Sequence, residues 1–392
     1  MRTSARLPLL CSCLPLILLT AAEHVYSGFN PRAYEKRSVS CKAVRRDQGD
    51  AVVDISLTYV DINPNASKTL IMVHGWPGLW SSWAYQIQEF KVVCVSVVCR
   101  GCSDELLQDD YHLIIPDLRG FGESGHPGDV KSSGTLFDMV GDLTCILEDA
   151  GVEKAVCVGH DWGSSVCYEA ARSRPDVFEG VVGGVVPYIP FVGNFTPISY
   201  LVPLLPRLTY QLFFDKQTPQ AVEELNHDIR RTLRSTLRMK TSPPPDDFLK
   251  SKDSFLDAWK EYEEIPPVPF LDKDEEDYFV ESYEKSGFDN TLQFYTDENR
   301  YASWKFAHDQ GNFTISQPDP VADWAVASKL LKSADYLDNL TTKMIQGSHW
   351  VHLEHADLFN TEMKKWLEEY FPATAPAISD HANPEKTLHE EL

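Results

Sequence analysis

The sequence has 392 residues, of which 43% are apolar and 11% aromatic, a composition typical of globular proteins rather than of disordered or collagen-like chains. Lys and Arg number 36 against 58 Asp and Glu, so the formal net charge is −22 at pH 7. A charge this negative argues against nucleic acid or an anionic membrane as the main partner. Nine cysteines in a chain of this length do not form a disulfide scaffold.

The first residues have the pattern of a secretory signal. Arg2 and Arg6 precede an apolar run over residues 7–19, and small residues follow up to Ala22. The apolar run is shorter than the roughly 20 residues that span a bilayer. We therefore expect a signal peptide over residues 1–22 and no stable membrane span after its cleavage, with an uncleaved anchor as the alternative.

Two further features indicate the secretory pathway. The last four residues, His389 to Leu392, resemble the His-Asp-Glu-Leu retrieval signal of the endoplasmic reticulum, at the end of a flexible acidic tail over residues 373–392. An ordinary acidic tail is the alternative. We expect location in the lumen of the endoplasmic reticulum, or secretion. Four Asn-x-Ser/Thr sequons are potential glycosylation sites, at Asn65, Asn194, Asn312 and Asn339.

The body of the chain alternates short apolar strands with helical patterns. Strands are predicted over residues 51–60, 68–73, 111–115, 154–158, 181–186 and 343–345, and helices over residues 136–147, 165–171 and 358–370. This alternation predicts an α/β fold with a mostly parallel sheet flanked by helices.

The alternation stops between about residue 190 and residue 307. This segment is helical, aromatic and charged, and prolines interrupt it at 243–245 and 266–267. We interpret it as a helical cap, or lid, inserted between two parts of one core, over residues 23–189 and 308–372.

A candidate nucleophile lies between the strand that ends near residue 158 and the helix that follows. In Gly-His-Asp-Trp-Gly at 159–163, one glycine lies two residues before Asp161 and one lies two residues after it, as in a nucleophile elbow. The Asp161 carboxylate can attack carbon and form an ester. The alternative is a helix N-cap, a position that Asp also favours.

Five motifs follow one another in order along the core and the cap. Three lie in the core: His-Gly-Trp-Pro-Gly at 74–78, Asp-Leu-Arg-Gly-Phe-Gly-Glu-Ser at 117–124 and the elbow. Two lie in the cap: Tyr-Gln-Leu at 210–212, and the region of Ser-Gly-Phe and Leu-Gln-Phe-Tyr that ends at Tyr295. In this set, over most of residues 40–372, the chain resembles the soluble-type epoxide hydrolases of the α/β-hydrolase fold. The resemblance implies hydrolysis of a small lipophilic epoxide to a vicinal diol, without metal or organic cofactor.

The resemblance also assigns roles to individual residues. Asp161 would be the nucleophile, and His349, in Gly-Ser-His-Trp at 347–350, would be the base that activates water. Ser348 stands where the family has glycine. Tyr210 and Tyr295 would hydrogen-bond the epoxide oxygen and supply a proton. The alternative for both tyrosines is packing in the cap core.

The motif at 74–78 and the elbow would together form the oxyanion hole. The backbone N–H groups of Trp76 and Trp162 would hold the ester oxyanion, and their side chains would wall an apolar pocket. Pro77 would fix the loop, and His74 belongs to the same pocket-forming motif. Arg119, paired with Asp117, would brace the loops below the site.

The third member of the triad is difficult to place. Pro318 and Pro320 interrupt residues 315–324, so we expect no proper strand there. Family-like sequence resumes at Asp323, which we predict to be the triad acid, with Asp319 as the alternative. Judged by the typical length of a strand, about half a dozen strand residues are missing between Pro318 and Asp323. Such a deficit would keep Asp323 from reaching His349.

Residues 92–108 form an atypical insert, rich in valine and containing Cys94, Cys99 and Cys102. Three interpretations stay open: a metal or redox insert, a lumenal disulfide, and a translated intron, which we favour. Outside the leader and the insert, the remaining cysteines have no paired metal-ligand spacing, and Cys157, in mid-strand, is expected to be a buried apolar residue.

Two other functions remain possible. A haloalkane-type dehalogenase also uses an Asp nucleophile, and it would need N–H donors such as that of Trp162 to bind halide. A catalytically impaired hydrolase-fold protein that binds an apolar ligand is the second alternative, suggested by the irregular sequence before Asp323.

Overall fold

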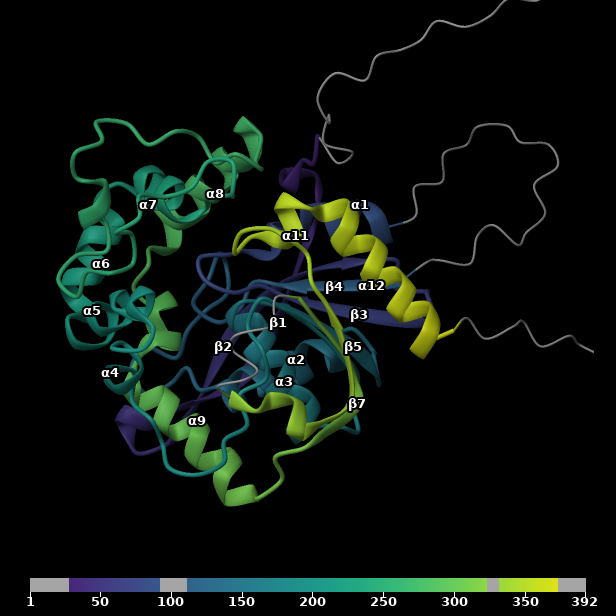
Figure 1. Ribbon diagram of the computed structural model, residues 1–392. Coiled ribbons are helices and arrows are strands. Elements are labelled where there is room, and N and C mark those ends of the chain that lie inside the picture. Colours follow the sequence, from purple (N-terminus) through teal and green to yellow (C-terminus); the bar gives the residue numbers. More distant parts are fainter. Residues whose placement is uncertain (1–27, 92–110, 323–330, 373–392) are drawn as a thin grey trace, which may run out of the picture.

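The computed structural model describes residues 28–91, 111–322 and 331–372. Four of the predicted features lie outside these ranges: the leader, the insert at 92–108, Asp323 and the acidic tail. The described residues form one central sheet, helices on both of its faces, and a group of helices to one side (Figure 1).

The sheet has eight strands in the order β1-β2-β4-β3-β5-β6-β7-β8. The strands β1 and β2 form an antiparallel pair at one edge, and β2 runs antiparallel to β4. All other neighbouring pairs are parallel. The bounds are β1 Lys36–Arg45, β2 Ala51–Ile62, β3 Lys68–Val73, β4 Tyr111–Pro116, β5 Ala155–His160, β6 Phe178–Gly184, β7 Ile315–Ala322 and β8 Leu337–Lys343. The mostly parallel sheet predicted from the sequence is confirmed.

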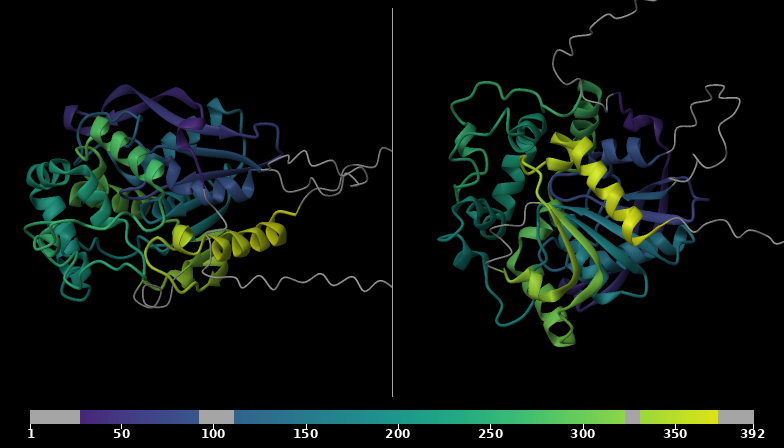
Figure 2. Two further views of the ribbon diagram at one scale, coloured as in Figure 1. Left: turned by 90° about the horizontal axis from the view of Figure 1, so that it is seen from above. Right: turned by 45° about the vertical axis from the view of Figure 1, so that its right-hand side comes forward.

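The central strands are apolar because both faces of the sheet are covered. Every residue of β4 and β5 is buried, and so is every residue of β3 after Lys68. The helices α2 (Leu136–Asp149) and α3 (Trp162–Ser173) pack on one face, while α1 (Ala84–Phe90) and α12 (Ala356–Tyr370) pack on the other (Figures 1 and 2).

Six α-helices lie between β6 and β7 in the chain, largely over the residues predicted to form the cap. In Figures 1 and 2 most of this group stands beside the carboxyl ends of the parallel strands. The bounds are α4 Ile198–Leu201, α5 Tyr210–Lys216, α6 Thr218–His227, α7 Ile229–Thr236, α8 Lys273–Ser286 and α9 Asp297–Gln310. The short 3-10 helix η7 (Thr291–Tyr295) precedes α9.

Three strand predictions differ from the structure. The last strand, predicted over residues 343–345, is β8 and ends at Lys343, where the prediction began. The alternation of β1 was overlooked, although Cys41 and Ala43 point inward from it. The expectation of no strand over residues 315–324 is contradicted by β7, which pairs with β8 along most of its length. β7 pairs with β6 only through Val321 and Ala322, so Pro318 and Pro320 lie where the ladder to β6 is open. Proline is tolerated at such a place because it has no N–H to donate.

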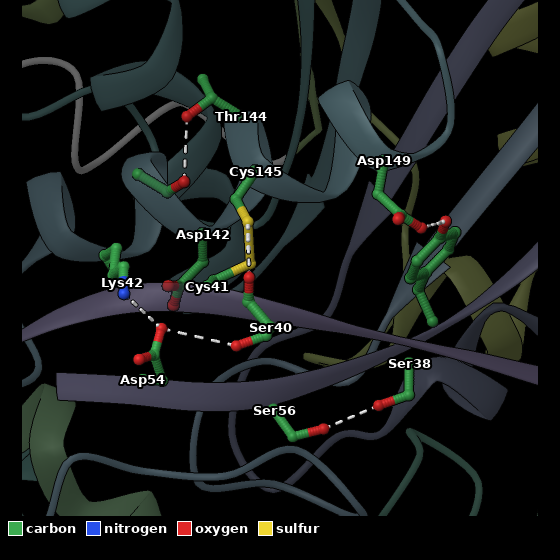
Figure 3. Close-up of a disulfide and its surroundings, with 12 residues drawn as sticks. Ser38, Ser40, Cys41, Lys42, Asp54, Ser56, Asp142, Thr144, Cys145 and Asp149 are labelled. Carbon is green, nitrogen blue, oxygen red and sulfur yellow. Dashed lines mark hydrogen bonds and ion pairs between the residues drawn. A yellow bond between two sulfur atoms is a disulfide. The ribbon is translucent and has the colours of Figure 1, made fainter.

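Four cysteines form two disulfides. Cys41 on β1 is bonded to Cys145 on α2, which ties the edge strand to the helix that covers it (Figure 3). Cys157 on β5 is bonded to Cys167 on α3. Cys157 is buried as expected, but its prediction as a simple apolar residue was wrong, because the first turns of α3 bring Cys167 back over the strand.

Arg119 does not pair with Asp117. Its guanidinium donates to both carboxylate oxygens of Asp142 on α2, at 2.5 and 2.7 Å, and both side chains are buried. Asp117 instead accepts from Lys36 Nζ at 3.1 Å and from the backbone N–H of Trp80 at 3.0 Å. Both oxygens of the Asp142 carboxylate can accept from the planar guanidinium at once, so Arg119 pairs with Asp142.

Candidate active site

Asp161 occupies a sharp turn between β5 and α3. Its backbone has φ +54° and ψ −123°, a conformation that residues other than glycine rarely adopt. A methyl group on Gly159 would lie 2.5 Å from the backbone of Gly163, and one on Gly163 would lie 2.8 Å from the carbonyl oxygen of His74. The flanking glycines are therefore needed for this turn. The side chain of Asp161 makes no N-cap hydrogen bond, so the alternative of a simple helix cap is not observed.

The two carboxylate oxygens of Asp161 have different surroundings. Oδ1 accepts from the backbone N–H of Trp76 at 3.0 Å, while Oδ2 lies 3.5 Å from Nε2 of His349. The backbone N–H of Trp162 also favours the charged form of the carboxylate. Burial raises the pKa of Asp161, and the charge of His349 and the two N–H groups oppose that rise. One oxygen is held in place, which leaves the other facing the histidine.

His349 is the histidine of its segment that reaches Asp161. It lies between β8 and α11 (Val351–Glu354), and its carbonyl oxygen accepts from Nε2 of His160 at 2.8 Å. His352 is fully buried against Trp83, and His355 instead lies 3.9 Å from Glu354. The structure thus brings together Asp161 and His349, as the sequence predicts.

The triad acid predicted at Asp323 stays a prediction. β7 ends at Ala322, which pairs with Gly184, and the carbonyl oxygen of Gly184 accepts from the N–H of Asp161 at 3.1 Å. Asp323 is the next residue after Ala322 and lies outside the described residues. Asp319 lies inside β7, opposite Leu340. The end of β7 therefore reaches the level of the elbow, where an acid that orients a histidine would be needed.

The loop after β3 supplies the N–H group of Trp76. The peptide bond from Trp76 to Pro77 is cis. His74 is buried, and its Nδ1 donates to the carbonyl oxygen of Gly75 at 2.9 Å while Nε2 accepts from the N–H of Leu118 at 3.0 Å. Burial lowers the pKa of His74, which agrees with a neutral ring in this tautomer. His74 therefore braces the loop from behind rather than lining the pocket.

The cap contributes Tyr210, at the start of α5, and Tyr295, at the end of η7. Their ring centroids are 5.6 Å apart, and each phenol affects the pKa of the other. Burial, together with the negative charge of Asp161, raises the pKa of Tyr210 to about 12 and raises that of Tyr295 as well. Both phenols therefore keep their protons at neutral pH and can act as donors.

Aromatic rings surround this group. The indole of Trp162 stacks on Phe294 with centroids 5.2 Å apart, and it meets Tyr295 edge-on. The indole of Trp76 makes edge-on or tilted contacts with four rings, and its Nε1 donates to Oγ1 of Thr291. The rings around Trp76 are Phe214, Phe255, Phe288 and Tyr295. These surroundings suit an apolar substrate.

Sequence reasoning missed two residues next to Tyr210. Gln211 donates from Nε2 to the hydroxyl of Tyr210 at 3.2 Å, and Arg300 donates to Oε1 of Gln211 at 2.6 Å. Gln211 was part of a motif without an assigned role. The only sequence signal for Arg300 is a single arginine in an aromatic segment, five residues after Tyr295.

The described part of the chain contains no group of three or more His, Cys, Asp or Glu that could hold a metal ion. None of the helices within it is long and apolar enough to cross a bilayer.

A family model described as alpha/beta hydrolase fold matches residues 68–356, most of the chain. The chain belongs to this family. The α/β-hydrolase fold expected from the motifs is confirmed, with the elbow after β5 and His349 after β8.

Several relatives of this α/β hydrolase are named epoxide hydrolases. Epoxide hydrolase A of Mycobacterium tuberculosis is 28% identical over 318 residues, which cover 76% of this chain and 90% of that protein. Bifunctional epoxide hydrolase 2 of Sus scrofa is 24% identical, and the match covers 84% of this chain but only 56% of that protein.

Solved structures show the same fold. Epoxide hydrolase A from Mycobacterium thermoresistibile has a TM-score of 0.66 at 23% identity, with 85% of this chain and 98% of that chain covered. Epoxide hydrolase VrEH1 from Vigna radiata has a TM-score of 0.64 at 20% identity, with 86% and 99% covered.

Proposed function

We propose that this α/β hydrolase is an epoxide hydrolase that converts a small lipophilic epoxide to a vicinal diol through an ester on Asp161. The observation that carries the proposal is the arrangement around Asp161. One carboxylate oxygen is held by the backbone N–H of Trp76, the other faces His349, and two protonated tyrosines lie in the cap among aromatic rings. The names of its relatives support the same activity.

The first step opens the epoxide. Because Oδ1 of Asp161 is held by Trp76, Oδ2 is the oxygen that attacks the epoxide carbon. The bond from that carbon to the epoxide oxygen breaks, and its electron pair stays on the oxygen. That oxygen takes a proton from a tyrosine hydroxyl, which becomes a phenolate. General acid catalysis of this kind typically contributes about 10²–10⁴-fold to the rate.

The second step releases the diol. His349 takes a proton from water, and the resulting hydroxide adds to the ester carbonyl carbon, whose oxygen is Oδ1. The negative charge on Oδ1 is stabilised by the backbone N–H groups of Trp76 and Trp162. Collapse expels the diol oxygen, which takes the proton from His349. The carboxylic acid left on Asp161 loses its proton to solvent, and the tyrosine phenolate regains one from solvent. The predicted role of the triad acid, Asp323, is to orient His349.

The surroundings of the indoles argue against the dehalogenase alternative. A halide site needs free N–H donors, but Nε1 of Trp76 donates to Thr291 Oγ1 at 3.1 Å, and the indole of Trp162 meets the ring of Tyr295 edge-on. The paired tyrosines instead match an oxygen that accepts a proton. A non-catalytic ligand-binding protein would have no need for the strained backbone of Asp161.

The test is to trap the ester. We would incubate the enzyme with styrene oxide as probe, quench in acid and identify the labelled peptide by mass spectrometry. The expected label is on Asp161, and it accumulates in His349→Gln while Asp161→Asn acquires none. A label on another residue, diol formation without any ester, or halide release from haloalkanes in place of diol formation would overturn the proposal.

We also propose that the chain enters the secretory pathway and stays in the lumen of the endoplasmic reticulum or is secreted. Two observations support this location. Disulfides persist mainly in oxidising compartments. All four sequon asparagines are exposed: Asn65, Asn194, Asn312 and Asn339. In cells, we expect an endoglycosidase to increase the gel mobility of the protein. Glycan-free protein with reduced cysteines would contradict the proposal.

A further inference from the structure

A chain of hydrogen bonds runs from a cation to the hydroxyl of Tyr210. Arg300 donates from Nη2 to Oε1 of Gln211 at 2.6 Å, and Gln211 donates from Nε2 to the hydroxyl oxygen of Tyr210 at 3.2 Å. Because arginine has only donors, it fixes which end of the Gln211 amide faces it. The amide must therefore present its N–H₂ group to Tyr210.

This orientation determines where the proton of Tyr210 can point. A phenol has one O–H donor and can accept at its oxygen. Gln211 donates to that oxygen, so the O–H of Tyr210 cannot point at Gln211. It remains available for a substrate oxygen.

Arg300 also places a positive charge beside both phenols. Its guanidinium carbon lies 5.1 Å from the ring centroid of Trp162 and 6.0 Å from that of Tyr295, and its Nε donates to the carbonyl oxygen of Phe294 at 2.9 Å. Among the described residues, no carboxylate forms an ion pair with Arg300 within 4.0 Å. Keeping a cation without a carboxylate partner in this half-buried place costs stability, which suggests that its charge serves the site.

We propose that Gln211 and Arg300 are positioning residues for epoxide opening: they orient the Tyr210 proton toward the epoxide oxygen and stabilise the phenolate that its transfer leaves. This inference rests on the proposed epoxide hydrolysis. In the step concerned, the bond from Asp161 to carbon forms, the carbon–oxygen bond of the epoxide breaks, and the proton moves from Tyr210 to that oxygen. Solvent later returns the proton.

The test separates ester formation from ester hydrolysis in single-turnover experiments with styrene oxide. Gln211→Glu keeps the shape of the side chain and an acceptor for Arg300 but removes the donor to Tyr210. We expect ester formation to slow by about 10²-fold, within the range of general acid catalysis, while ester decay changes less than about twofold. The matched control is Gln220→Glu, which adds the same charge at an exposed position of α6 and should change neither rate.

A second background distinguishes positioning from a structural role. In Tyr210→Phe the acceptor hydroxyl is absent, so adding Gln211→Glu should change the rate of ester formation by less than about threefold. Arg300→Met should behave like Gln211→Glu, and Arg300→Lys, which keeps the charge, should recover part of the loss. These variants also keep the test valid if one of them fails to fold.

Equal losses in the wild-type and Tyr210→Phe backgrounds would overturn the inference, and so would equal slowing of ester formation and decay. If the wild-type enzyme forms no ester on Asp161, the proposed function itself fails. If it forms the ester and Gln211→Glu forms it equally fast, only the positioning role of Gln211 and Arg300 fails.

Discussion

The buried pair of Arg119 and Asp142 offers a sharp test of what supports the site. Arg119 donates to both carboxylate oxygens and to the carbonyl oxygens of Ser133 and Asp138, at 2.9 and 3.2 Å. Its own carbonyl oxygen accepts from Nε2 of Gln293 at 2.7 Å, which links it to η7, the helix that ends at Tyr295. Both charged side chains are at most 2% exposed.

The expected cost follows from which groups lose a partner. Arg119→Met leaves the Asp142 carboxylate buried without its cation, which costs about 3–5 kcal/mol of unfolding free energy. In Arg119→Met/Asp142→Leu no charge remains, and the main loss is a donor to the buried backbone carbonyl of Ser133, about 1–3 kcal/mol. The double variant should therefore be more stable than Arg119→Met, although it contains one more substitution.

Urea denaturation of the wild type, both single variants and the double variant measures this coupling. We expect a coupling energy of at least about 2 kcal/mol in the double-mutant cycle. The rate of ester formation should fall in Arg119→Met and partly recover in the double variant, because the loop under Tyr295 regains its position. Additive stability losses would refute the view that the buried charge, rather than side-chain packing, dominates.

Three further predictions concern the elbow, the edge strand and the pH profile. Gly75→Ala places a methyl group against Asp161, 2.6 Å from its Cβ, so unfolding free energy should fall by about 1–3 kcal/mol and ester formation by at least about 10-fold; an unchanged rate would contradict the geometry. Replacing Cys41 and Cys145 by serine should lower the free energy of unfolding by up to about 4.7 kcal/mol, as expected for a disulfide that closes a loop of about 100 residues. An unchanged midpoint of urea unfolding would show that the disulfide is absent. As the pH is lowered, kcat/KM should fall with a midpoint above the usual Asp pKa of roughly 3.9, because burial raises the pKa of Asp161. On the alkaline side, Tyr210, with a pKa of about 12, should cause no loss of kcat/KM up to about pH 10. An acid midpoint at or below the usual Asp pKa would count against an ionised, buried nucleophile.

The sequence predicted those elements whose pattern is strong and local. The strand over Lys68–Val73 was predicted with its observed bounds, because an uninterrupted apolar run buried on both faces leaves little ambiguity. The elbow was predicted because glycines on both sides of Asp161 are required by the turn itself. His349 was predicted from its motif rather than from any periodicity.

What the sequence could not give depends on contacts between distant segments. Proline normally argues against a strand, and only the open ladder beside Pro318 makes β7 possible. Arg119 has several acids within reach of its loop, and the choice of Asp142 depends on where α2 packs. The role of Gln211 becomes visible only when α9 brings Arg300 to its other side.

The narrow junction between β6 and β7 has a consequence for how the enzyme would lose activity on heating. β7 and β8 pair with each other at six positions, but they join the rest of the sheet through Val321 and Ala322 alone. Such a pair can open as one cooperative unit at a lower free energy than global unfolding. Amide hydrogens of β8 should therefore exchange sooner than those of β5, and His349, in the segment that follows β8, would move away from Asp161 while most of the protein is still folded.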